Sequence, residues 1–179
     1  MAFTQSGDEV LLCDNAYGPT KRFCHKILAK YNVKTTHIES NIGEEISAYF
    51  NNKTKLIFLE SPGSNTFEIQ DIRAIVKAAK KAGIMIIIDS TWATPLYLKS
   101  LDLGADVAIQ SVTKYICGHS DVLMGCATVN EKYADEFANY FETVENYTNP
   151  QDCYSALRGL RSLKAVSYTH LRAHETFAN

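Results

Sequence analysis

The alternation of short apolar runs with amphipathic stretches limits the possible folds of this chain more than any other feature. Apolar runs of strand length predict extended segments at residues 10–13, 33–38, 56–59, 84–88, 107–109 and 123–129. Helical periodicity between these runs predicts helices at residues 21–31, 44–50, 69–82, 131–145 and 155–164. Strands separated by helices favour an α/β fold with three layers, in which helices cover both faces of a mostly parallel sheet.

Two of the expected helices have a clear apolar face. The face of segment 69–82 consists of Ile69, Ile72, Ile75, Val76 and Ala79. Gly83 follows this segment directly and is a suitable C-terminal stop. The face of segment 21–31 consists of Phe23, Ile27, Leu28 and Tyr31. Segment 166–179 is polar and lacks apolar periodicity, so we treat it as an atypical tail that does not continue the α/β pattern.

Composition argues against several classes of protein. Of the 179 residues, 46% are hydrophobic and 21% are charged, which suits a folded core. The formal net charge of −2 at pH 7 argues against a nucleic-acid binder. The longest apolar run, residues 84–88, is too short to span a membrane. The N-terminal residues lack the basic and apolar regions of a secretion signal.

The cysteines indicate a reducing compartment and no metal cluster. The five cysteines are scattered and form no C-x-x-C pair, so neither a disulfide framework nor a zinc site is expected. We expect a cytoplasmic protein whose cysteines are small buried apolar side chains. His170 and His174 have the i, i+4 spacing of some metal-binding pairs, but no third ligand is apparent. We therefore expect no metal site.

Polar residues follow several predicted strands at the point where α/β sheets place their chemistry. Asp89 ends the most apolar strand, where a carboxylate is costly without a partner. Taken alone, it is equally well explained as a helix cap or an acceptor for backbone amides. Lys114 follows another predicted strand among small and apolar residues. We expect it to be buried, which favours the neutral, nucleophilic amine over a solvated surface lysine.

Together these residues meet the requirements of pyridoxal phosphate (PLP). Its aldehyde needs a lysine amine, and its ring nitrogen, on the opposite side of the ring, needs a carboxylate. Lys114 and Asp89 come from the ends of different strands and satisfy these two needs. Ser111 and Thr113 are two residues apart, so on an extended segment they would lie on one side and could both face the phosphate. Tyr17, in a loop after the first strand, could stack on the cofactor ring.

Six ordered motifs resemble one family, the pyridoxal-phosphate enzymes of cysteine and methionine metabolism. These motifs are residues 14–20, 60–64, 89–93, 111–115, 118–121 and 157–163. The resemblance covers about residues 3–165 and implies a fold like that of aspartate aminotransferase. It also implies that residues 1–165 are the central part of a cofactor-binding domain, without the N-terminal segment and the C-terminal domain of the family.

The resemblance assigns a role to each candidate residue. It implies that Lys114 binds the cofactor aldehyde and that Asp89 pairs with the pyridinium nitrogen. It further implies that Ser111 and Thr113 contact the phosphate. Tyr17 would stack on the ring, and it could also assist proton transfer. Thr91 would lie beside the cofactor.

Within the family, the resemblance is strongest to the cystathionine β-lyases. The γ-lyases and γ-synthases usually have Phe where Trp92 stands, and Thr-Asn-Pro where this chain has residues 63–65. The resemblance implies β-elimination of cystathionine, a small sulfur-containing amino acid, to homocysteine, pyruvate and ammonia. In that reaction the Lys114 amine would remove the α-proton.

Two other functions stay open. The chain could belong to a γ-lyase, a γ-synthase or a cysteine desulfhydrase, or it could be a cofactor-domain piece without activity. The family draws phosphate donors from an N-terminal segment and a neighbouring subunit, and its substrate-carboxylate arginine from a C-terminal domain. We therefore expect the full-length enzyme to be a homotetramer and this chain alone to be inactive.

Overall fold

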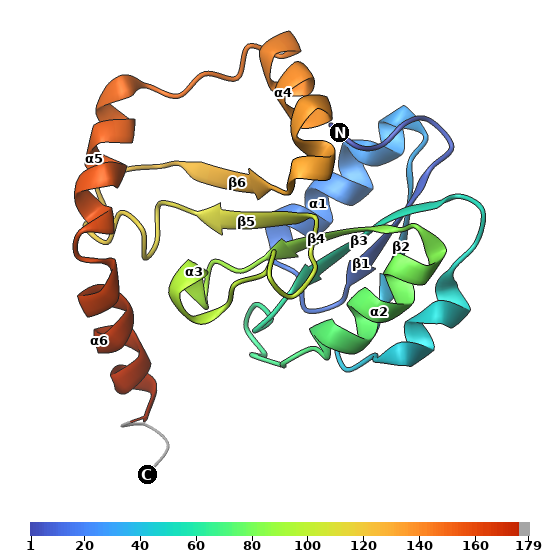
Figure 1. Ribbon diagram of the computed structural model, residues 1–179, viewed down its shortest axis with the longest axis horizontal. Helices are drawn as coiled ribbons and strands as arrows, with labels where there is room; N and C mark the ends of the chain where they lie inside the picture. The colour runs from blue at the N-terminus through green and yellow to red at the C-terminus, as the bar shows by residue number, and fades with distance from the viewer. Residues whose placement is uncertain (176–179) are drawn as a thin grey trace.

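The computed structural model describes the backbone of residues 1–175 and the side chains of residues 1–170. Within these residues one six-stranded sheet has the order β2-β1-β3-β4-β5-β6, as Figure 1 shows. Its strands are β1 (Glu9–Cys13), β2 (Lys34–Ile38), β3 (Thr54–Glu60), β4 (Met85–Asp89), β5 (Val107–Ser111) and β6 (Gly125–Val129). All neighbouring strands are parallel except β5 and β6, which are antiparallel. The prediction of a mostly parallel sheet is thus confirmed.

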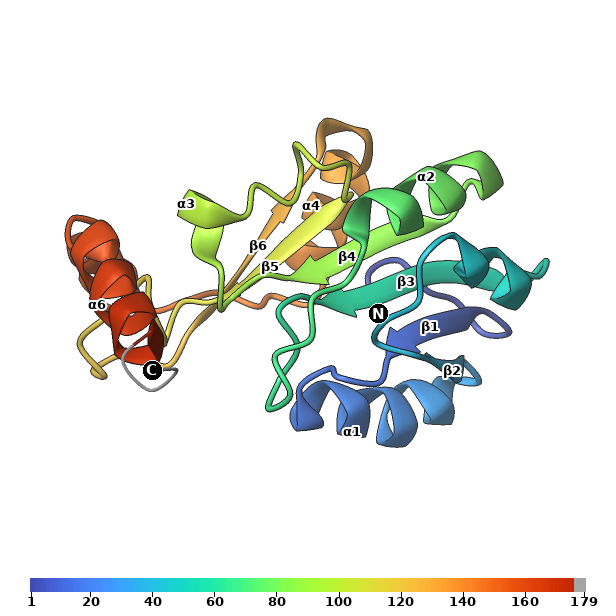
Figure 2. The ribbon, with the colours of Figure 1, turned by 90° about the horizontal axis from the view of Figure 1, so that it is seen from below.

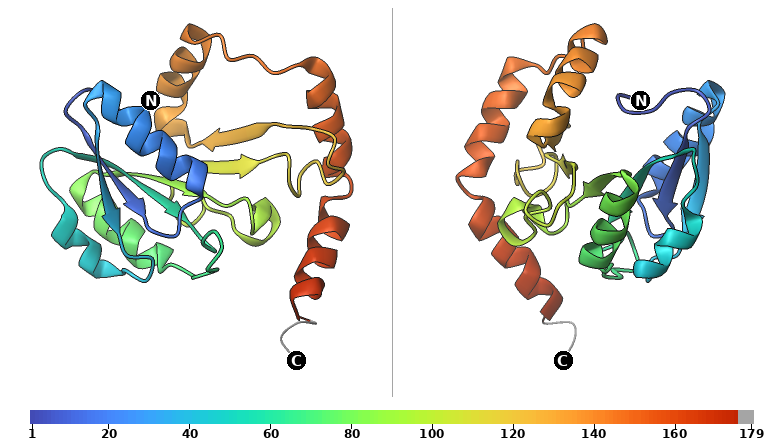
Figure 3. Two further views of the ribbon diagram at one scale, coloured as in Figure 1. Left: turned by 180° about the vertical axis from the view of Figure 1, so that it is seen from behind. Right: turned by 45° about the vertical axis from the view of Figure 1, so that its right-hand side comes forward.

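Helices lie on both faces of this sheet. The α-helices are α1 (Gly18–Lys26), α2 (Ile72–Ala82), α3 (Thr94–Tyr97), α4 (Ala134–Thr143), α5 (Pro150–Leu160) and α6 (Leu163–Glu175). Short 3-10 helices occur at η1 (Leu28–Tyr31), η2 (Glu44–Tyr49) and η3 (Glu131–Tyr133). Figure 2 shows α1 on one side of the sheet and α2 on the other. Both views in Figure 3 show α5 and α6 beside the ends of β5 and β6, away from α1.

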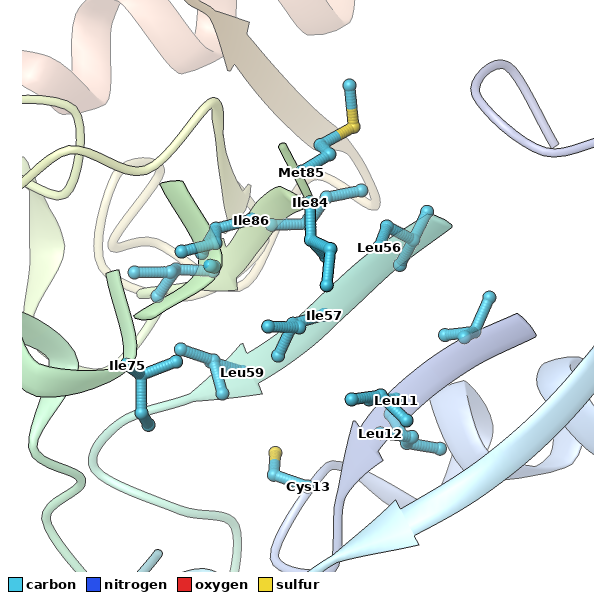
Figure 4. Packing of buried hydrophobic residues seen from close by; sticks show 14 of the residues in the cluster. Leu11, Leu12, Cys13, Leu56, Ile57, Leu59, Ile75, Ile84, Met85 and Ile86 are labelled. Carbon is cyan, nitrogen blue, oxygen red and sulfur yellow. The ribbon is translucent and has the colours of Figure 1, made fainter. Parts of the chain in front are cut away.

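The core forms because the central strands are apolar on both faces. The residues of β1 and most of those of β4 are buried, which is typical of parallel strands covered by helices on each side. Figure 4 shows Ile75 of α2 next to Leu59 of β3, and both side chains are fully buried. Burial of such side chains contributes about 1.5–3 kcal/mol each.

Helix α2 confirms most of its predicted apolar face but begins later than expected. Its buried residues are Ile72, Ile75, Val76 and Ala79. The Asp71 side chain accepts the Ala74 N–H at 3.0 Å and starts the helix there, so Ile69 precedes it and is 71% exposed. Gly83 has a φ of 70° and ends the helix, as predicted.

The other expected helices and strands differ from the structure mainly at their ends. Segment 21–31 is α1 followed by η1, and Pro19 in the first turn explains the earlier start. The buried residues are Cys24 in α1 and Leu28 in η1, whereas Phe23 and Tyr31 are exposed, so the predicted face is wrong at these two. The last strand begins at Gly125 because Leu123 lies in an exposed loop.

The C-terminal part of the chain is more helical than the sequence pattern predicted. Segment 155–164 spans the end of α5 and the start of α6, and α6 continues to Glu175. Among residues 163–170 of α6, whose side chains the structure describes, the buried ones are Leu163 and the small Ser167, which is too weak a pattern to signal a helix. No helix within residues 1–175 is long and apolar enough to cross a membrane. Cys126 and Cys153 are exposed, so the expectation of buried cysteines is wrong for these two.

Candidate cofactor site at the carboxyl edge of the sheet

All the residues predicted to form the site line one cavity of about 600 Å³. These residues are Tyr17, Asp89, Thr91, Ser111, Thr113 and Lys114. They come together because parallel strands bring their carboxyl ends to one edge of the sheet. Asp89 and Ser111 are the last residues of β4 and β5, and Tyr17 lies between β1 and α1.

A chain of hydrogen bonds joins the ends of β4 and β5. The Asp89 Oδ1 atom accepts the Thr91 N–H at 3.0 Å and the Thr91 hydroxyl at 2.6 Å. The Thr91 oxygen in turn accepts the Ser111 N–H at 2.8 Å. Thr91 therefore holds one oxygen of the Asp89 carboxylate in place. The Oδ2 atom has no hydrogen-bond partner among the described residues and is available to a ligand.

Lys114 lies in the turn that follows β5, and the expectation that it is buried is wrong. Its N–H donates to the Ser111 carbonyl at 3.1 Å, and its side chain is exposed at the cavity. In this turn Val112 and Ile116 enter the core, with exposed fractions of 2% and 8%. The intervening Lys114 consequently points away from the core, toward the cavity and solvent.

The expected geometry of Ser111 and Thr113 is also wrong, although both line the cavity. Thr113 lies in the turn rather than on an extended segment, so the alternation of a strand does not apply to it. Its hydroxyl accepts the Met124 N–H at 2.9 Å and donates to the Met124 carbonyl at 3.2 Å. The Ser111 hydroxyl has no partner among the described side chains and is the freer donor of the two.

Aromatic residues form one wall of the cavity, and one of them, Phe67, had no predicted role. The Phe67 and Trp92 ring centroids are 5.2 Å apart, and those of Trp92 and Tyr115 are 6.0 Å apart. Burial raises the pKa of Tyr115, so its phenol stays neutral. Phe67 could not be predicted as a site residue because it lies in the loop after β3. The path of a loop has no sequence periodicity that would place this residue at the cavity.

Glu60 is a second residue to which the sequence assigned no individual role. It ends β3, pairs in register with Asp89 and lines the same cavity. Its Oε2 atom accepts the Tyr17 N–H at 2.7 Å. Its position at a strand end within a recognised motif was the signal that could have identified it.

Helix α5 supports the loop that follows Lys114. The Arg158 Nη2 and Asp121 Oδ2 atoms form an ion pair at 2.5 Å, and the Cys117 thiol donates to the other Asp121 oxygen at 2.9 Å. Gly159 packs directly on this loop: a Cβ atom there would lie 2.3 Å from the Cys117 carbonyl oxygen. The His119 Nδ1 atom contacts the same carbonyl at 2.5 Å.

Comparison with known proteins identifies the family. Residues 1–178 match the family described as Cys/Met metabolism PLP-dependent enzyme. The chain belongs to this family. Its members are PLP-dependent enzymes that act on amino acids, so the predicted cofactor and enzyme class are confirmed.

Relatives in this family carry different reaction names. Cystathionine β-lyase of Escherichia coli is 40% identical over 165 residues, which are 91% of this chain and 42% of that protein. The L-alanine/L-glutamate racemase of Wolbachia pipientis is 38% identical over 182 residues, 99% of this chain and 43% of that protein. Each relative is thus more than twice as long as the part matched.

A solved structure confirms the fold. The cystathionine γ-lyase of Lactobacillus plantarum, complexed with L-serine, has a TM-score of 0.87 and 29% sequence identity to this chain. The match covers 90% of this chain and 43% of that one. The predicted three-layer fold of the family is therefore correct, and the chain spans less than half of these related proteins.

The residues in the cavity fit PLP. An amine from Lys114 and a carboxylate from Asp89 approach the cavity from the ends of different strands, as the two sides of the cofactor ring require. The volume of about 600 Å³ lies within the range typical of small-molecule sites. No group of three or more His, Cys, Asp or Glu within the described residues could hold a metal ion, and the His174 side chain lies outside that set.

Proposed function

We propose that the full-length protein catalyses β-elimination of cystathionine to homocysteine, pyruvate and ammonia, with PLP in the cavity at the carboxyl edge of the sheet. The observation that carries this proposal is the placement of Lys114 and Asp89 around one cavity. Similarity to cystathionine β-lyase of E. coli supports the β-elimination. γ-Elimination of the same substrate is the second candidate, because the chain also superposes on a γ-lyase.

The proposed roles follow from the chemistry of each side chain. When bound, PLP supplies an electron sink for negative charge at the substrate α-carbon. Lys114 would hold the cofactor aldehyde through Nζ, and its free amine would take the substrate α-proton. Asp89 holds a proton at the ring nitrogen through Oδ2, while Thr91 fixes its orientation through Oδ1.

The remaining residues would bind and orient the cofactor. The Ser111 hydroxyl is free to donate to the phosphate, and Thr113 lies beside it in the turn after β5. The Tyr17 ring covers the cofactor ring from the loop before α1 and can assist proton transfer through its hydroxyl. In this arrangement the carboxylate is held firmly by the sheet, and the amine lies in a turn.

The proposal extends to the whole protein. Residues 1–165 form the central part of its cofactor domain, although the family match itself continues to residue 178. The full-length protein is a homotetramer in the cytoplasm, where five cysteines suit a reducing compartment. This chain alone is expected to be inactive, because it spans less than half the length of the relatives that it matches.

Cofactor binding is tested by trapping. The full chain is mixed with PLP and treated with borohydride, and the modified peptide is identified by mass spectrometry. Modification at Lys114 is expected, and it should be lost in Lys114→Ala but kept in Lys99→Ala, a lysine away from this cavity. Modification elsewhere, or none in the full-length enzyme, would contradict the assignment.

The reaction is tested by its products. The full-length enzyme is supplied with cystathionine, and β-elimination is expected to give homocysteine and pyruvate. Cysteine and 2-oxobutyrate would instead show γ-elimination. Lys114→Ala should lower turnover by about 10²–10⁴-fold or more, since it removes the residue that moves the proton.

A further inference from the structure

We propose that Glu60 is a positioning residue that fixes Tyr17, and with it the start of α1, at the wall of the cavity. The inference rests on the proposed function, in which Tyr17 covers the cofactor. Glu60 lies 43 residues further along the chain, at the end of β3, and its Oε2 accepts the Tyr17 N–H at 2.7 Å. This distance is short, as expected for a hydrogen bond to an ionised carboxylate.

Tyr17 needs such an anchor because little else holds it. It is the N-cap residue of α1, but its side chain makes no capping hydrogen bond and is 53% exposed. In a capping box, a Glu at the third helical position bonds the N-cap N–H; here that position is Thr20. Glu60 supplies the missing acceptor from a neighbouring strand and places negative charge at the positive end of the helix.

Three titratable groups surround the Glu60 carboxylate. Asp89 lies beside it on β4, Lys21 approaches from α1, and the Cys13 thiol belongs to β1. The pKa of Glu60 is raised to about 7, mainly by burial and also by the charge of Asp89, while the Tyr17 N–H and Lys21 oppose this rise. Burial raises the pKa of Cys13 to about 12, so this thiol stays neutral and adds no charge.

These conditions make the anchor sensitive to pH. Above pH 7 the ionised Glu60 carboxylate accepts the Tyr17 N–H strongly. As the pH falls through about 7, Glu60 takes up a proton and becomes a weaker acceptor. The position of Tyr17 should therefore loosen on the acid side of neutrality, while Asp89 remains oriented by its own bonds to Thr91.

Hydrogen exchange of the Tyr17 amide tests the anchor in the full chain without cofactor. In the wild type, protection of the Tyr17 amide against exchange should fall about ten-fold between pH 8.5 and 5.5, after correction for the intrinsic effect of pH on exchange. In Glu60→Gln, protection of the Tyr17 amide should be low and independent of pH. In Glu60→Ala, this protection should fall about 10–100-fold below that of the wild type. Glu45→Gln, which removes an exposed carboxylate in η2, should behave like the wild type. If Glu60→Ala fails to fold, the wild-type pH series and Glu60→Gln still decide the matter.

A double-mutant cycle tests whether Glu60 acts through Tyr17. In the full-length enzyme, Glu60→Gln should weaken PLP binding about ten-fold, but have no further effect in a Tyr17→Ala background. Equal weakening in both backgrounds would show a purely structural role and overturn the proposal. The proposal would also be overturned if Glu60→Gln left the protection of the Tyr17 amide unchanged. Failure of PLP to attach to Lys114 would contradict the proposed function, yet leave the exchange result standing.

Discussion

Replacing Gly159 by Ala should push α5 away from the loop that carries Lys114. A Cβ atom at this position would lie 2.3 Å from the Cys117 carbonyl oxygen and 2.4 Å from that of Ile116. A carbon–oxygen contact normally needs about 3.3 Å, so the helix and the loop would have to separate by about 1 Å. Both obstacles are backbone atoms, so no side-chain rotation relieves the contact.

The expected cost follows from two opposing effects. Overpacking of this kind costs about 1–3 kcal/mol, and the upper end applies because only backbone movement relieves it. Alanine gains about 1 kcal/mol over glycine in a helix interior. The net loss should be about 2 kcal/mol, which lowers the melting temperature by about 4–8 °C in a chain of this size.

Urea and thermal unfolding followed by circular dichroism measure this change. Gly125→Ala is the matched control, because its nearest atom would be the Gln110 carbonyl oxygen at 3.9 Å, an ordinary contact. The control should stay within about 0.5 kcal/mol of the wild type. If Gly159→Ala is as stable as the wild type or more stable, helix propensity outweighs the contact. The argument that α5 is fitted to the loop is then refuted.

Two further predictions concern polar groups that are hydrogen-bonded within the fold. Burial would raise the pKa of Glu9, but hydrogen bonds from Lys34, Thr36 and Asn51 hold it at about 2. Glu9 therefore contributes its full stabilisation at a pH above its ordinary pKa of 4.5. Urea unfolding at a series of pH values should show that this contribution, on the order of 1–3 kcal/mol, disappears between about pH 5 and 2. The Glu9→Gln variant should not show this loss. Thr91→Val removes the hydroxyl between Asp89 and Ser111, so the free energy of unfolding in urea should fall by about 1–3 kcal/mol. Thr91→Ser keeps a hydroxyl and should retain most of this stability.

The sequence was sufficient to predict most of the elements but not their order in the sheet. Apolar runs identified the central strands because burial on both faces confines the polar residues of β1 and β4 to the strand ends. Helix ends were harder: periodicity continued to Ile69, yet the Asp71 cap decides where α2 starts. The strand order β2-β1-β3-β4-β5-β6 depends on long-range pairing, which no local pattern encodes.

The site was predictable in its members and less so in its geometry. Lys114 and Asp89 were found because an amine and a carboxylate at the ends of different strands together meet the requirements of PLP. The exposure of Lys114 and the turn at Thr113 were missed because both depend on how the chain folds after β5. Glu60 was given no role because its bond to Tyr17 joins residues far apart in sequence.

The site divides into a fixed part and a part that can move, and this division suits the proposed chemistry. Asp89 has to stay at one place beside the ring nitrogen, and the sheet register and two bonds from Thr91 hold it there. Lys114 has two proposed roles in succession, at the cofactor aldehyde and at the substrate α-proton. It lies in a turn and its side chain is exposed. A lysine packed in the core could not move between these positions without breaking contacts. The exposure that contradicted the expectation for Lys114 is therefore what its two proposed roles require.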